Sequence, residues 1–150
     1  MYHRFDENKY PSTNIRMPAF KKQINYIENL EISFLNAKNL NKKISEPNMN
    51  KLVLLTIDDA YLSFYENAWP FLKKKNIPFL LFVSTEFVGK KGYMSWKQIQ
   101  EIEENELATI GNHSHSHDYL VDKKKIDILK DIKKSINIFK NKLGYNPKYF

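Results

Sequence analysis

One unbroken apolar run that ends in two carboxylates constrains the fold of this chain more than any other feature. The run covers residues 51–57 (KLVLLTI), and Asp58 and Asp59 follow it directly. A continuous apolar segment of this length is typical of a strand buried on both faces of a parallel sheet. The sequence therefore predicts an α/β fold with two acidic side chains at the carboxyl end of an inner strand.

Strands and helices alternate along the rest of the chain. Further strands are predicted at residues 1–5, 32–35, 78–84, 107–110 and 149–150, and helices at 18–30, 61–75, 95–105 and 126–143, with a polar connection at 37–50. Pro70 is expected to break or restart the second helix near Trp69. Ser95 and Gln98 have the spacing of a capping box, and Gly144 is placed to end the last helix.

Alternating strands and helices imply a parallel sheet with right-handed crossovers and active groups at the carboxyl ends of the strands. We count about six strands, whereas a closed barrel of this kind has about eight. The predicted fold class is an α/β, incomplete (β/α) barrel with parallel strands and outer helices, truncated at both ends.

Length and charge limit the classes of function. The 150 residues correspond to one domain, and the absence of cysteine restricts a transition-metal site to His, Asp and Glu ligands. The net charge of +7 comes almost entirely from lysine, which favours a compositional bias over a nucleic-acid site, so no nucleic-acid partner is predicted. No apolar segment is long enough for a membrane span, and the first residues do not resemble a signal peptide. Localisation and oligomeric state stay open.

The acidic pair has two interpretations. Carboxylates after a strand commonly cap the following helix. Alternatively, because neighbouring residues on an extended chain point to opposite sides, Asp59 and Asp58 can divide two tasks, one binding a metal and the other facing a reacting water as base.

The histidines of the segment GNHSHSH, residues 111–117, are the other candidate ligands. His113 and His117 would be about 13 Å apart on an extended strand but about 6 Å apart on a helical turn. They can therefore share one ion only if the segment curls after Gly111, which directs His115 elsewhere. One Asp and two His leave open positions on a catalytic metal, and with Asp58 as base such a site is that of a hydrolase. A surface loop that binds metal adventitiously is the alternative.

These motifs carry a resemblance to a known family. TIDDAY resembles the TFDDG motif, and GNHSHSH the HSxxH motif, of the polysaccharide deacetylases, carbohydrate esterase family four. Residues 65–89 and 93–99 resemble the segments between these motifs, so the similarity covers nearly the whole chain. The resemblance implies one partial deacetylase domain over residues 1–150, with Asp58 as catalytic base and Asp59, His113 and His117 as ligands of a divalent metal, usually Zn²⁺.

The N-terminal YHRF resembles the start of the permuted members that deacetylate poly-N-acetylglucosamine. This implies removal of N-acetyl groups with release of acetate, His3 as general acid, and a periplasmic or cell-surface location. A structural, hydrogen-bonded role is the alternative for His3. A catalytically silent glycan-binding fragment and a polysaccharide O-acetyl esterase are the alternative functions.

Two departures from the family pattern and three aromatic residues complete the expectations. Ala60 stands where the family has glycine, which adopts positive φ more freely, and the family's later Arg-x-Pro-Tyr type motif is expected beyond Phe150. Tyr61, Tyr93 and Trp96 are candidate sugar-binding residues, with packing in the core or rim as the alternative.

Overall fold

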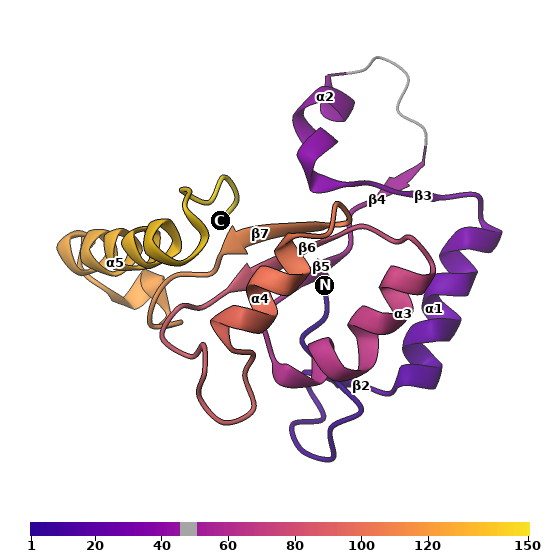
Figure 1. The fold of residues 1–150 in the computed structure, drawn as a ribbon, viewed down its shortest axis with the longest axis horizontal. Coiled ribbons are helices and arrows are strands. Elements are labelled where there is room, and N and C mark those ends of the chain that lie inside the picture. Colours follow the sequence, from indigo (N-terminus) through magenta and orange to yellow (C-terminus); the bar gives the residue numbers. More distant parts are fainter. Residues whose placement is uncertain (46–50) are drawn as a thin grey trace.

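A three-stranded parallel sheet forms the centre of the protein in the computed structural model, which describes residues 1–45 and 51–150 (Figure 1). Strand β6 (Phe79–Val83) lies between β5 (Thr56–Ile57) and β7 (Ala108–Asn112). Both pairings are parallel, with Ile57 opposite Leu81 and Val83 opposite Asn112. The predicted parallel α/β fold is confirmed.

Two smaller parallel pairs flank this sheet. Strand β1 (Arg4–Phe5) pairs with β2 (Asn14–Ile15), and β3 (Ser33–Phe34) pairs with β4 (Leu52–Val53). The prediction of one strand over residues 51–57 is wrong, because β4 and β5 have different partners and form two short strands. Residues 46–50 of the predicted polar connection lie outside the described residues.

The burial of this apolar run also differs from the prediction. Leu55 and Ile57 are buried, whereas residues 52–54 are only half-buried. Strand β4 pairs with the short β3 at the margin of the sheet, so only the end of the run next to the acidic pair lies in the core.

In the described part of the chain, four helices of six or more residues pack around the strands. They are α1 (Met17–Asn29), α3 (Trp69–Lys74), α4 (Trp96–Glu103) and α5 (Lys125–Leu143), joined by the shorter α2 (Leu40–Ile44) and 3₁₀ turns at Ala37–Asn39 and Leu120–Asp122. Helices α1 and α3 lie side by side (Figure 1), and the rings of Phe20 and Phe71 are 5.9 Å apart. No helix among the described residues is both long and apolar enough to cross a bilayer.

The segment before Pro70 winds as a π-helix over Phe64–Ala68. The N–H of Trp69 bonds to the carbonyl of Phe64, five residues back, and α3 then begins at Trp69 as predicted. Proline removes one helical hydrogen bond and crowds the carbonyl four residues before it. A wider turn accommodates the ring without ending the helical path.

The predicted ends of α4 and α5 are confirmed. Ser95 and Gln98 form the full capping box, and Gly144 ends α5 with φ 83°. The apolar stripe of α5 is only partly covered, because Phe139 is buried while Ile126 and Leu129 are 56% and 44% exposed.

The strand predicted at residues 149–150 is not formed. The N–H of Asn112 donates to the carbonyl of Tyr149 at 2.8 Å, but no strand pairing develops there. This bond and one from the Tyr149 hydroxyl to the carbonyl of Ala37 hold the segment beside the end of β7 without extending the sheet.

Aromatic packing fixes the N-terminal segment against the sheet. Phe5 is fully buried between Phe20 and Phe64, with ring centroids 5.0 and 5.8 Å away, and Phe64 in turn packs on Phe79 of β6 at 5.2 Å. Rings of this size bury more apolar area than any other side chains in a small core. Residues 1–5 are therefore held beside β5.

Gly111 of β7 is the glycine that the sheet requires. A Cβ there would lie 2.7 Å from Cδ1 and Cε1 of Phe82 on the adjacent strand. Overpacking of this kind costs about 1–3 kcal/mol, so we expect Gly111→Ala to lower the free energy of unfolding by that amount in chemical denaturation. A double-mutant cycle with Phe82→Leu tests the cause. The cost of the alanine should shrink when Phe82→Leu is also present, and an equal cost with and without Phe82→Leu would contradict the clash.

Candidate metal centre

The main chain at the end of β5 places Asp58 beside His3. Tyr2 N–H donates to the carbonyl of Thr56 at 2.9 Å, and Asp58 N–H donates to the carbonyl of Tyr2 at 2.8 Å. These two bonds align residues 1–3 with β5, so that His3 Nε2 lies 3.8 Å from Asp58 Oδ2.

A left-handed turn follows and directs the second carboxylate elsewhere. Asp59 and Ala60 have φ values of 71° and 54°. The carbonyl of Ala60 accepts a 2.9 Å bond from Met94 N–H, which holds the turn. The turn thus keeps the conformation that favours glycine, and Ala60 adopts it at a cost of about 1 kcal/mol.

The histidine segment curls as the shared-ion hypothesis requires. After β7, His113 N–H still bonds to the carbonyl of Val83 at 3.0 Å, but Ser114 and His117 adopt φ values of 67° and 59°. His117 N–H closes the turn on Ser114 Oγ at 3.0 Å. The predicted turn after Gly111 is confirmed.

Residues that follow β6 support this turn, although no sequence motif pointed to them. Ser84 Oγ donates to the carbonyl of His113 at 2.9 Å, and Thr85 N–H to that of Ser114 at 3.2 Å. Thr85 Oγ1 lies 2.8 Å from Nδ1 of His115. His115 is therefore turned away from Asp58 and Asp59, as predicted, and its Nε2 lies 3.7 Å from Glu86 Oε2. Small hydroxyl residues directly after a strand were the available signal.

Asp59, His113 and His117 converge on one point. Asp59 Oδ1 lies 3.6 Å from His113 Nε2 and 3.0 Å from His117 Nε2. One ligand atom from each residue lies within 4.8 Å of the others, as in a site that could hold a metal ion. Two imidazole nitrogens and one carboxylate oxygen are a donor set that suits Zn²⁺.

Unpaired buried oxygens support the fit of a cation. Asp58 and Asp59 are each 6% exposed, and among the described residues Oδ1 of each has no hydrogen-bond partner. The 3.0 Å approach of His117 to Asp59 is an ion-pair contact without hydrogen-bond geometry. Buried carboxylate oxygens are rarely left unpartnered, and a cation between the three ligands would satisfy that of Asp59.

The site shifts the pKa values of its two carboxylates in opposite directions. Burial raises the pKa of Asp58, although His113 and His3 oppose this effect. Burial would also raise the pKa of Asp59, but the neighbouring His117 and His113 outweigh it and lower the pKa. Asp58 is thus the stronger base of the pair, and Asp59 is the carboxylate whose ionised form its neighbours stabilise.

The two histidines also differ. The Asp59 carboxylate raises the pKa of His117, whereas burial lowers the pKa of His113. The lowered pKa of His113 favours its neutral form, in which imidazole binds a metal.

Two hollows lie next to histidines of the candidate site. One of about 340 Å³ is lined by His113, His117 and Tyr119, and another of about 180 Å³ by His3 and Thr13. Open space therefore lies beside His113 and His117 on one side and beside His3 on the other.

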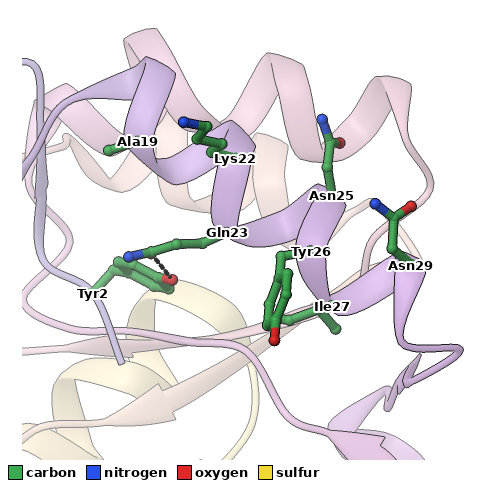
Figure 2. Close-up of a pocket in the computed structure, with 8 residues that line it drawn as sticks. All are labelled: Tyr2, Ala19, Lys22, Gln23, Asn25, Tyr26, Ile27 and Asn29. Carbon is green, nitrogen blue, oxygen red and sulfur yellow. Dashed lines mark hydrogen bonds between the residues drawn. The ribbon is translucent and has the colours of Figure 1, made fainter.

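A roomier hollow of about 790 Å³ lies against α1 (Figure 2). Tyr2, Gln23 and Tyr26 line it, and the Tyr2 hydroxyl donates a hydrogen bond to Gln23 Oε1 at 2.6 Å. None of the described residues that line it carries a carboxylate or an imidazole.

The three candidate sugar-binding aromatics pack on other side chains. The rings of Tyr61 and Tyr93 are 4.8 Å apart, and the Arg4 guanidinium covers Tyr61 at 3.5 Å. Trp96 makes an edge contact with Phe139 at 5.9 Å. Tyr61 is only 8% exposed, so little of its face is open to a ligand.

Comparisons with known proteins agree with this geometry. Residues 45–150 match the family described as polysaccharide deacetylase. The poly-beta-1,6-N-acetyl-D-glucosamine N-deacetylase of Staphylococcus epidermidis is 32% identical, over 77% of this chain and 45% of that protein. The enzyme of the same name from Staphylococcus aureus is 28% identical, over 81% of this chain and 47% of that protein. The chain thus spans just under half the length of these curated relatives.

Two solved structures have the same fold. IcaB from Ammonifex degensii is 29% identical with a TM-score of 0.87, over 99% of this chain and 70% of that one. The Streptococcus pyogenes deacetylase PplD, solved in complex with acetate, is 22% identical with a TM-score of 0.84, over 98% of this chain and 69% of that one. The match confirms the predicted incomplete barrel of this type.

Metal affinity tests the three converging ligands. Changes beside a metal's ligands already weaken binding about 10–100-fold, so we expect His113→Ala or His117→Ala to raise the Kd for Zn²⁺ at least that much in calorimetric titration. His115→Ala is the comparison and should lose less, because it keeps all three proposed ligands and removes only a contact with Thr85. Equal losses from all three variants would show that the loop binds metal without the proposed geometry.

Proposed function

Because this chain belongs to the polysaccharide deacetylase family, we propose that it is part of a metal-dependent N-deacetylase acting on a polysaccharide that contains N-acetylglucosamine. The convergence of Asp59, His113 and His117 beside Asp58 carries the proposal. The names of the curated relatives support this choice of polymer. In this proposal residues 1–150 form part of a single deacetylase domain.

Asp59, His113 and His117 would hold the ion, with Zn²⁺ favoured by the two imidazole ligands. The bound ion would supply a polarised acetyl carbonyl and water with a pKa lowered towards about 7. The carboxylate in this set lowers the net charge of the centre. Because Asp59 is buried, few water molecules can compete with the ion for its carboxylate oxygens.

Asp58 is proposed as the general base. Its carboxylate takes the proton from the water that attacks the acetyl carbon, and the raised pKa of Asp58 brings it closer to the value that favours proton transfer near neutrality. The C–N bond of the resulting tetrahedral adduct then breaks, which releases acetate.

His3 is proposed as the general acid. The nitrogen that leaves the acetyl carbon must gain a proton to depart as an amine, and His3 Nε2 lies 3.8 Å from the base, within the same small volume. Its ring also lines the hollow of about 180 Å³, from which it can reach a bound sugar. Tyr93 and Trp96 remain proposed contacts of the sugar rings, whereas the burial of Tyr61 favours the alternative of packing for that residue.

Loss of the base should separate catalysis from metal binding. We expect Asp58→Asn to slow acetate release from N-acetylglucosamine oligomers about 10²–10⁴-fold, with the Kd for Zn²⁺ little changed. A chelator should abolish the activity of the parent chain. Chelator-resistant release would refute a metal mechanism, and release from O-acetylated but not N-acetylated oligomers would identify an esterase instead. If the parent chain binds oligomers without releasing acetate, it is a glycan-binding module.

The proposed role of His3 as general acid can be tested by changing the leaving group of the substrate. An amine needs a proton to leave, whereas 4-nitrophenolate does not. We therefore expect His3→Ala to lower kcat on N-acetylglucosamine oligomers about 100-fold or more but to change hydrolysis of 4-nitrophenyl acetate by less than about tenfold. His3→Gln, which keeps the polar bulk, is the control for packing. Equal effects on amide and ester would assign His3 a structural role.

A further inference from the structure

The turn at residues 113–117 is held from two sides. On one side its carbonyls accept hydrogen bonds from the residues that follow β6. Ser84 Oγ bonds to the carbonyl of residue 113 at 2.9 Å, Thr85 N–H to that of 114 at 3.2 Å, and Glu86 N–H to that of 115 at 3.0 Å. The carbonyl side of the turn is therefore fixed by the central strand.

The amide side is held by a single carboxylate of α5. Asp131 Oδ2 accepts from His115 N–H at 2.8 Å, and its Oδ1 accepts from Ser116 N–H at 2.9 Å. These two bonds help to lower the pKa of Asp131 against the effect of burial, which alone would raise it. Asp131 thus bridges two consecutive amides of the turn.

One helical turn further along α5, a second contact fixes the helix itself. Ser135 Oγ accepts a 2.8 Å bond from Asn112 Nδ2, and both residues are buried. Positions four apart share one face of a helix, so Asp131 and Ser135 both face the end of β7. The carboxylate is therefore set in place by a rigid element and not by the turn it holds.

We propose that Asp131 is a positioning residue of the metal centre, which fixes the turn so that the rings of His113 and His117 converge on Asp59. This inference rests on the proposed metal site. The aspartate contacts the amides between the two ligands and neither ring, so its effect passes through the backbone.

Strain in the turn explains why such a brace is needed. Ser114 and His117 have positive φ, and each non-glycine residue in that region costs about 1 kcal/mol or more. Without Asp131 the amides of residues 115 and 116 would turn to water, and the segment could relax towards an extended form. There the two ligands would be about 13 Å apart, too far for one ion.

Zinc affinity of the full chain tests the proposal. We expect Asp131→Ala to raise the Kd for Zn²⁺ tenfold or more, in the range of about 10–100-fold seen when partners of ligands are lost. Asp131→Asn should lose less, because its amide oxygen can still accept one of the two N–H groups. Asp127→Ala is the matched control. Asp127 is an exposed aspartate of the same helix, and together with Asp131 it lines a hollow of about 360 Å³. Its Kd should stay within about twofold of the parent value.

Amide hydrogen exchange of the metal-free chain gives a second readout. We expect the amides of His115 and Ser116 to exchange at least about tenfold faster in Asp131→Ala, while amides of β6 keep the parent rate. If Asp131→Ala does not fold, the same two measurements on Asp131→Asn decide. Faster exchange with an unchanged Kd would overturn the positioning role and leave a structural brace.

The result also separates this inference from the function on which it rests. A parent chain with no affinity for Zn²⁺ would refute the metal centre and the role of Asp131 together. A parent chain that binds Zn²⁺ tightly, with equal affinity in Asp131→Ala, would overturn the role of Asp131 alone.

Discussion

Parallel pairing of β5, β6 and β7 is the constraint on which the candidate centre depends. Parallel strands end at the same edge of a sheet, so the residues that follow them meet in space although they are far apart in the chain. Asp59 follows β5 and His113 follows β7. These two strands are the neighbours of β6 on either side, so one strand lies between them. The pairing of Val83 with Asn112 sets the level at which the histidine turn begins.

The segment after β6 contacts both the turn at Asp59 and the turn that carries the two histidines. Its first residues, Ser84 and Thr85, bond to the histidine turn, and Met94 bonds to the carbonyl of Ala60 beside Asp59. A single loop therefore holds both left-handed turns. Each turn is strained at non-glycine residues, and strain of this kind persists only where surrounding contacts determine the backbone.

Local patterns predicted the elements but not their partners. The capping box at Ser95 and the end of α5 at Gly144 depend on neighbouring residues, and both were correct. The split of residues 51–57 into two strands depends on which segments pair with each half, which no local pattern records. The same holds for the site. The spacing of His113 and His117 predicted the turn, but the hydroxyl groups and the aspartate that hold it come from other elements, the segment after β6 and helix α5. The roles of Asp58 and His3 stay predictions.

Ala60 shows how narrow the choice of residue at one backbone position can become. Its φ of 54° favours glycine, yet it is 1% exposed and its methyl group belongs to the core. Glycine would relieve the backbone and leave a small void, while a larger side chain would add crowding to a conformation that β-branched residues rarely adopt. The positive φ and the burial of the methyl group therefore both favour a very small residue here, and alanine in place of the family's glycine keeps the turn.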